Sequence, residues 1–462
     1  MFLLARLLSP ADFGLSGMAG IFYGLSNVLA EFGLGTAVLH MPELDRKALG
    51  QLHAFSVMLC AGLFLITILA SPWVAGFFHS DHVAFFMVGN VGLFVTGFQA
   101  VPLGLLQRDM DYRRLALSEA AMVLVQSGVM LVAALLGWGY WSLLVGAAAG
   151  KAMAAVLVCI WKPVPFAWPR LKDIRAPIDM GRHLAVGRLA AAVYSQADGI
   201  IVGRIMGDAT LGIYQMAMNL ASAPAEKVSS LLMRTAAPLF ANVMDDKPMV
   251  RRYYLIMVEA MSLLILPLML GLAIVAPLAV RVILGPKWAA AAEPLRWLTL
   301  YVILRTMGVL TDQVLVSQKR TNLTMRASLV NFCLMPAAFF AAARWLGPGA
   351  VAAAWVMLAP VTMIPMLIVL LRRIELPLRS LGSTLVPSVC GSSVMCLAVY
   401  AVRRALEPAQ LSAQSGLLLE MTCGAAVYLG VEFIFFRSRF TRYSDFIGGM
   451  ISKKSRRNPL DL

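Results

Sequence analysis

The sequence has little charge for its length. Of 462 residues, 14% are charged and 60% are apolar, whereas about 25% of the residues in an ordinary soluble domain are charged. The mean hydropathy is +0.79, and no segment is polar enough to form a soluble domain of its own. The composition therefore argues against a soluble enzyme or binding module and indicates a chain whose main solvent is lipid.

The sequence also lacks the motifs of common catalytic and metal sites. It contains no GxxxxGK[ST] loop for a nucleotide, no Ser/His/Asp set and no CxxC pair, and its six cysteines all fall within apolar runs. His79 and His82 have a spacing that a metal could use, but we interpret the segment around them as a plain external loop. We therefore predict that the protein is not an enzyme and holds neither a metal nor another cofactor.

Long apolar runs recur along the whole chain. A helix needs about 20 apolar residues to cross hydrocarbon roughly 30 Å thick, and its backbone polar groups must be satisfied within the segment. The predicted spans lie near residues 1–8 (only the end of a helix), 13–38, 48–71, 83–106, 115–136, 140–161, 181–206, 210–240, 253–284, 289–316, 322–345, 349–371, 381–402 and 414–436. The predicted fold is an all-α polytopic membrane protein with about 14 transmembrane helices, the first of them truncated.

Lys and Arg are distributed unequally between alternate connections. One set of connections, together with the tail after Phe436, holds 25 of these residues, and the other set holds four. Cytoplasmic loops of membrane proteins are enriched in Lys and Arg, so we expect the C-terminal tail to be cytoplasmic. The net charge of +15 is spread in small groups rather than gathered on one face, so we expect no nucleic-acid partner. We interpret the basic tail as an orientation signal and an anchor on anionic lipid.

A ten-residue segment is repeated. Arg6-Leu-Leu-Ser-Pro-Ala-Asp-Phe-Gly-Leu15 is similar, without a gap, to Arg204-Ile-Met-Gly-Asp-Ala-Thr-Leu-Gly-Ile213, at an offset of 198. The copies follow predicted helices 1 and 7, so the repeat unit has six helices and both copies have the same orientation. Parallel repeats of this kind place a substrate site near the membrane midplane. The predicted divisions are an N-terminal lobe over 1–175, a C-terminal lobe over 176–375, two further helices over 376–436 and a tail over 437–462.

Polar residues recur at helical spacing inside four predicted spans. A charged side chain at the bilayer centre costs about 2.5–3.5 kcal/mol, so such residues normally face the protein interior or a water-filled cavity. The residues that we expect to line one central cavity are Tyr23, Asn27, Glu31, Arg188, Asp198, Gln215, Asn219, Glu226, Arg305 and Asp312. The alternative is that these stripes only form hydrogen bonds between closely packed helices.

Cations outnumber acidic residues in these spans. The cations are Arg188, Lys227, Arg234, Arg296 and Arg305, and the clear acidic partners are Asp198, Glu226 and Asp312. A positive excess suits an anionic substrate group, and Arg and Lys commonly bind phosphate. We expect Arg188 and Arg305 to be the main phosphate ligands. The acidic residues could pair with these cations or carry a coupling proton, and the sequence leaves both alternatives open.

Several segments together resemble Wzx-type oligosaccharide and lipopolysaccharide flippases, close to the colanic-acid exporter branch of the multidrug/oligosaccharidyl-lipid/polysaccharide exporter superfamily. The segments are Leu4–Gly14, Glu31–Gly35, Leu106–Arg113, Asp198–Arg204 and Leu211–Tyr214. The resemblance covers most of the chain and implies two six-helix lobes with two extra helices. Members of this family have a complete first helix before the first of these segments, so we expect the chain to be N-terminally short.

The resemblance also implies a function. Such a flippase transfers an undecaprenyl-diphosphate-linked oligosaccharide repeat unit across the bacterial inner membrane for exopolysaccharide or lipopolysaccharide biosynthesis. Its expected partners are this lipid-linked substrate, the bilayer, and candidate polysaccharide polymerase and export proteins. One alternative is a drug or metabolite antiporter of the same superfamily, which would favour acidic over basic cavity residues. Another is a membrane-embedded polymerase or ligase, which would need a large external loop that this sequence lacks.

Overall fold

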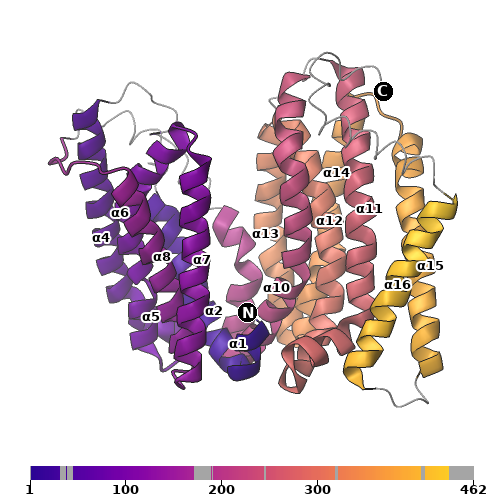
Figure 1. Cartoon of the computed structure of the whole chain (residues 1–462), viewed down its shortest axis with the longest axis horizontal. Coiled ribbons are helices and arrows are strands. Elements are labelled where there is room, and N and C mark those ends of the chain that lie inside the picture. Colours follow the sequence, from indigo (N-terminus) through magenta and orange to yellow (C-terminus); the bar gives the residue numbers. More distant parts are fainter. Residues whose placement is uncertain are drawn as a thin grey trace. The chain divides into compact units, whose positions relative to one another are not determined.

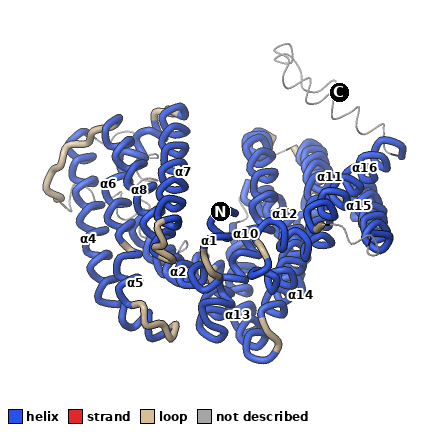
Figure 2. Tube along the Cα trace, turned by 60° about the horizontal axis from the view of Figure 1, so that its bottom comes forward, coloured by secondary structure: helices blue, strands red, loops and turns tan. Residues whose placement is uncertain are grey.

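The structure is a computed structural model that describes residues 2–31, 38, 45–170, 189, 191–243, 246–317, 321–406 and 412–435. Its helices are α1 (Phe2–Leu7), α2 (Pro10–Glu31), α4 (Arg46–Phe77), α5 (Val83–Gly89), α6 (Val91–Arg108), α7 (Tyr112–Leu135), α8 (Trp141–Trp161), α10 (Ala197–Asn242), α11 (Lys247–Ala279), α12 (Ala292–Ser317), α13 (Thr321–Trp345), α14 (Pro348–Arg373), α15 (Leu378–Leu406) and α16 (Ala413–Phe435). In these ranges the long elements are helices throughout (Figures 1 and 2). The predicted all-α fold is confirmed.

Eleven helices of the described residues are long and apolar enough to cross a membrane. Large apolar side chains stand on their outer faces, such as Trp73, which is 81% exposed, and Leu124, which is 73% exposed. Water would disfavour so many exposed apolar groups, whereas lipid accommodates them. The chain is therefore a multi-pass membrane protein.

Several helices begin where a side chain caps their first turn. At the start of α2 the Ser9 amide donates to Asp12 Oδ2 at 2.8 Å, and the Asp12 amide donates to Ser9 Oγ at 3.2 Å. This reciprocal capping box satisfies two of the free amides at a helix start, and Pro10 occupies the first helical position, where no amide hydrogen is needed. Asp45 caps α4 by accepting from the Ala48 amide at 2.7 Å.

Two predicted spans differ from the structure in detail. The predicted span 83–106 is two helices, α5 and α6, which meet at Asn90, where the side-chain amide donates to the Phe86 carbonyl at 2.8 Å. Asn readily forms such local bonds in competition with the helix. The predicted spans 181–206 and 210–240 fall partly outside the described residues. Their described part, α10, is broken at Gly207 by φ 84° and ψ 179°, between the two predicted spans.

The described helices form two compact units. The first comprises Met1–Met216 and Asn331–Ala354, and the second comprises Ala217–Val330 and Trp355–Leu462. These units do not test the lobe boundaries at 175 and 375, which stay a prediction. In the first unit α4, α6, α7 and α8 lie side by side (Figure 1). In the second, α11 packs against both α12 and α15, and α15 packs against α16.

The two copies of the repeated segment contact each other within the first unit. A Cβ at Gly14 would lie 1.7 Å from the Asp208 carbonyl oxygen, and a Cβ at Gly212 would lie 1.9 Å from the Pro10 carbonyl oxygen. Gly14 and Gly212 are equivalent positions of the repeat, and so are Pro10 and Asp208. The contact is therefore reciprocal, and it allows two helix starts to cross at a distance that only glycine permits.

The second unit contains an ion pair that positions its last two helices. Arg403 of α15 donates from Nε to Glu420 Oε1 at 2.9 Å and from Nη2 to Glu420 Oε2 at 2.5 Å, and Glu420 of α16 is 3% exposed. The same Nη2 donates to the Ile274 carbonyl of α11 at 2.9 Å. Because a two-pronged pair satisfies both carboxylate oxygens, the charges are compensated where they are buried.

Candidate functional site

Three predicted site residues form a chain of hydrogen bonds along α2. Tyr23 Oη donates to Asn27 Oδ1 at 2.9 Å, and Asn27 Nδ2 donates to Glu31 Oε1 at 2.9 Å. Thr96 of α6 also donates to Asn27 Oδ1, at 3.1 Å. The three residues are spaced four apart, so one helix face brings them together, and Thr96 ties that face to a second helix. We call this set, with the lysine described next, the α2 network.

Lys151 of α8 joins the α2 network, although it was not among the predicted site residues. Its Nζ donates to the Tyr23 hydroxyl and lies 4.2 Å from the centroid of the Tyr23 ring. The ring face and the hydroxyl oxygen both stabilise the cation. A lysine within an otherwise apolar span is itself a sign of function or close pairing, and that rule, applied to the span 140–161, would have identified it.

Asp198 and Gln215 lie at packed contacts within the first unit. Asp198 is 5% exposed, and its Oδ2 accepts a hydrogen bond from Tyr214 Oη at 2.7 Å. Gln215 lies against Gly17, where an added Cβ would come within 2.1 Å of its Oε1. Both contacts match the alternative in which polar residues fasten helices together. Tyr214 had not been predicted as a partner, since the distance between two helices cannot be read from their separate patterns.

The other predicted site residues lie in the second unit and are exposed. Asn219 and Glu226 stand on one face of α10, seven residues apart, and Arg305 and Asp312 stand on one face of α12, also seven apart. None of the four forms a hydrogen bond or an ion pair with another residue that the structure describes. We call these four residues the open polar set.

Within a membrane span, an exposed charged side chain must face either lipid or water. Residues 286–317 form one candidate membrane span, and Arg305 lies well inside it. An arginine that faced lipid at that depth would cost about 2.5–3.5 kcal/mol. The exposed face of α12 that carries Arg305 is therefore expected to meet water, and its guanidinium can donate up to five hydrogen bonds to an anion.

Arg188, the other predicted phosphate ligand, lies outside the described residues. The prediction for it therefore stays a prediction. Among the described residues, the structure brings together Tyr23, Asn27 and Glu31, with Lys151 as a fourth member. It leaves Asn219, Glu226, Arg305 and Asp312 available to a ligand.

The histidines of the external loop have separate partners. The His79 ring contacts Arg204 Nη1, with its two nitrogens at 2.8 and 2.7 Å, whereas His82 Nδ1 lies 3.3 Å from Tyr140 Oη. Arg204 also donates to the Phe77 carbonyl and lies over the Phe77 ring. Arg204 thus holds the turn after α4, and the described part of the chain contains no group of three residues suited to a metal.

Comparisons with known proteins agree with the fold. Residues 3–293 match the family described as "Polysaccharide biosynthesis protein". The chain is 24% identical to the teichuronic acid biosynthesis protein TuaB of Bacillus subtilis (strain 168), over 87% of this chain and 84% of that protein. It is 22% identical to the lipopolysaccharide biosynthesis protein WzxC of Escherichia coli (strain K12), over 73% of this chain and 70% of that protein.

A solved structure extends the similarity to nearly the whole chain. The lipid II flippase MurJ in an inward closed conformation aligns with a TM-score of 0.77 at 13% identity, over 95% of this chain and 96% of that one. At this identity the likeness establishes the fold. The family match covers well over half of the sequence, and the relatives confirm the resemblance to Wzx-type proteins. The chain belongs to the polysaccharide biosynthesis protein family.

Proposed function

We propose that this protein is a flippase that moves an undecaprenyl-diphosphate-linked oligosaccharide repeat unit across the bacterial inner membrane for surface polysaccharide synthesis. The relatives are named for teichuronic acid and lipopolysaccharide biosynthesis, and MurJ, which shares the fold, is named a lipid II flippase. The proposal needs no catalysis, because the substrate changes leaflet without a covalent bond being formed or broken.

The observation that carries the proposal is the exposed, uncompensated guanidinium of Arg305. Its side chain lies within a membrane span and forms no ion pair with any residue that the structure describes. A diphosphate carries charge and acceptor oxygens that match a guanidinium in two-pronged geometry. Arg305 is the proposed docking point for the lipid diphosphate, and Arg188 is a second proposed phosphate ligand.

The remaining members of the open polar set are the proposed contacts for the oligosaccharide. Asn219, Glu226 and Asp312 offer amide and carboxylate groups, which suit sugar hydroxyls because a hydroxyl both donates and accepts. The polyprenyl chain stays in the hydrocarbon of the bilayer throughout, so its apolar surface is never exposed to water. Tyr23, Asn27 and Glu31 of the α2 network stay secondary candidates for sugar contacts, because their hydrogen bonds to one another are already made.

The unequal distribution of Lys and Arg supports a cytoplasmic C-terminal tail, with loading of the substrate from the cytoplasmic leaflet. Polysaccharide polymerase and export proteins are the proposed partners on the opposite side, since a flipped repeat unit must next be polymerised.

Complementation tests the proposal. The chain is expressed in a strain that lacks its own repeat-unit flippase, together with Arg188→Ala and Arg305→Ala variants whose membrane levels are matched by immunoblot. We expect the unaltered chain to restore surface polysaccharide and both variants to lose most of it. Full export by both variants would contradict the proposed diphosphate site, and failure of the well-expressed unaltered chain with several repeat-unit types would contradict the flippase itself.

A further inference from the structure

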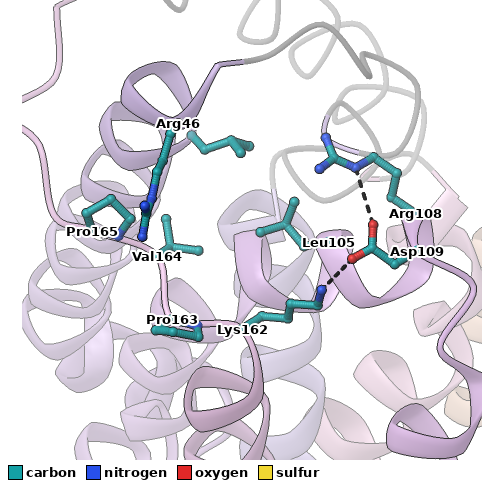
Figure 3. A pocket seen from close by; sticks show the side chains of 9 residues that line it. Arg46, Leu105, Arg108, Asp109, Lys162, Pro163, Val164 and Pro165 are labelled. Carbon is teal, nitrogen blue, oxygen red and sulfur yellow. Dashed lines mark hydrogen bonds and ion pairs between the residues drawn. The ribbon is translucent and has the colours of Figure 1, made fainter.

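A cavity of about 190 Å³ lies where α4 begins and where α6 and α8 end, within the first unit. It is separate from the α2 network and the open polar set. Three cations line it, one from each of these helix ends, namely Arg46, Arg108 and Lys162. Figure 3 shows Arg108 and Lys162 approaching the carboxylate of Asp109 from two sides, while Arg46 extends beside Val164 and Pro165.

The charges in this cavity are only partly compensated. Asp109 Oδ2 accepts from Lys162 Nζ at 2.5 Å, and Asp109 Oδ1 lies 3.8 Å from Arg108 Nε. The hydrogen bond from Lys162 and the nearby positive charges lower the pKa of Asp109, so its carboxylate is ionised at neutral pH. The cavity lining thus has three cations and one carboxylate, and Arg46 has no ion-pair partner in the described part of the chain.

Arg108 also carries a donor in need of an acceptor. Its Nη1 is buried and has no hydrogen-bond partner among the described residues. A buried donor without a partner costs free energy, and more so when the group is charged. An acceptor in the cavity with at least two oxygens could satisfy Arg108 while it contacts Lys162 or Arg46.

The chain builds the wall of this cavity by a close backbone approach. A Cβ at Gly50 would lie 2.7 Å from the Pro165 carbonyl oxygen, and the Ala167 amide donates to the Gly50 carbonyl at 3.4 Å. Val164 packs on an apolar cluster that includes Leu49 and Leu105. The segment after α8 is thus held over the start of α4, and it gives the cavity an apolar wall beside its cationic rim.

We propose that this cavity binds a phosphoryl group, with the headgroup of an anionic membrane phospholipid as its occupant. The cationic rim matches the phosphate oxygens, and the apolar wall of Leu49, Leu105 and Val164 matches the glycerol and the first methylenes. The cavity lies at helix ends, which is the depth of lipid headgroups in a membrane. The inference does not depend on transport and would hold for any activity of this chain.

Lipid binding to the purified full-length protein tests the proposal. The protein is exchanged from phosphatidylcholine into mixtures with phosphatidylglycerol, and retained phosphatidylglycerol is counted by native mass spectrometry. Arg108→Gln is expected to weaken retention about tenfold, because charged hydrogen bonds are lost. Arg114→Gln is the matched control, since Arg114 pairs with Asp111 outside the cavity lining and should retain lipid as the unaltered protein does.

Asp109→Asn is a second variant, and its expected result, tighter lipid binding, could not come from misfolding. This variant removes the acid that competes for Lys162 and Arg108, so it should bind phosphatidylglycerol about two- to fivefold more tightly. Inorganic phosphate is tested as a competitor. Displacement of phosphatidylglycerol by phosphate supports the phosphoryl chemistry. Binding of phosphate without lipid would overturn the lipid occupant, and equal lipid retention by Arg108→Gln, Arg114→Gln and Asp109→Asn would overturn the site.

Discussion

The predicted site residues behave differently in the two units of the molecule. In the first unit, Tyr23, Asn27 and Glu31 are joined by hydrogen bonds to one another. In the second, Arg305 and Asp312 are exposed and have no hydrogen-bond or ion-pair partner among the described residues. On a helical wheel both sets look alike, as polar stripes at intervals of four or seven residues.

The difference concerns how much hydrogen-bonding capacity remains for a ligand. Asn27 accepts from Tyr23 and Thr96 and donates to Glu31, so three of the four hydrogen bonds that its amide group can form are already made. Arg305 can add bonds without breaking any that the structure describes. We therefore assign substrate binding mainly to the open polar set and helix positioning mainly to the α2 network.

Charge reversal at Arg305 is expected to have the largest effect. Arg305→Glu replaces the proposed diphosphate ligand with a repelling group, so lipid transfer in proteoliposomes should fall by about 100-fold or more. Arg296→Glu is the matched control, because Arg296 lies nine residues earlier on α12 and so on its opposite face. Equal losses in both variants would show that the position of the charge on α12 does not matter.

Alanine at Gly14 is expected to have the largest effect on folding. The added Cβ would meet the Asp208 carbonyl oxygen, and relief of such overpacking costs about 1–3 kcal/mol. Gly20→Ala on the same helix is the control, since a Cβ there meets nothing within 4 Å and alanine favours helix by about 0.5–1 kcal/mol. Thermal unfolding in detergent should show a lower midpoint for Gly14→Ala only. Equal midpoints would mean that the repeat contact is not close-packed.

Substituting leucine for one asparagine in each set tests the α2 network and the open polar set separately. Asn27→Leu removes the acceptor of Tyr23 and Thr96, so it should lower the free energy of unfolding by about 1–3 kcal/mol. Asn219→Leu should leave thermal unfolding unchanged and slow lipid transfer a few-fold, in line with one lost hydrogen bond of about 0.5–1.5 kcal/mol. The opposite pattern, with Asn27→Leu stable and inactive, would assign binding to the α2 network instead.

Removal of the Lys151 charge is expected to have the smallest effect. Lys151→Met keeps the length of the side chain but loses the bond to the Tyr23 hydroxyl and the contact with its ring. The free energy of unfolding should fall by only about 1 kcal/mol, because the variant also loses the cost of holding a charge within the membrane span. A large drop in lipid transfer at unchanged stability would make Lys151 part of the binding surface.

Most of the fold could be predicted because the bilayer fixes the length of apolar runs. The break in α10 at Gly207 was also predictable. Gly207 corresponds to Ser9 in the repeated segment, and Ser9 lies between α1 and α2. The division of one span into α5 and α6 was not, because it coincides with a local side-chain hydrogen bond from Asn90, which the hydropathy of the run does not show. The contact of Gly14 with Asp208 could not be predicted either, since similarity between two segments does not show that they touch.

The site could be predicted only along single helices. The spacing of Tyr23, Asn27 and Glu31 indicated that they share a face, because helical phase depends on one segment alone. The partners Thr96, Lys151 and Tyr214 come from tertiary packing or from a turn across a kink. The same limit applies to exposure: Asp198 and Asp312 have similar surroundings in sequence, yet one is buried against Tyr214 and the other is exposed.

The most direct test of the division is substrate binding to the purified protein. An undecaprenyl-diphosphate-linked oligosaccharide is titrated against the unaltered chain, Arg305→Ala and Asn27→Ala, and the bound fraction is measured by native mass spectrometry. The account predicts that Arg305→Ala weakens binding about tenfold or more and that Asn27→Ala binds as the unaltered chain does. Unchanged binding by Arg305→Ala, with loss of binding in a folded Asn27→Ala, would contradict it.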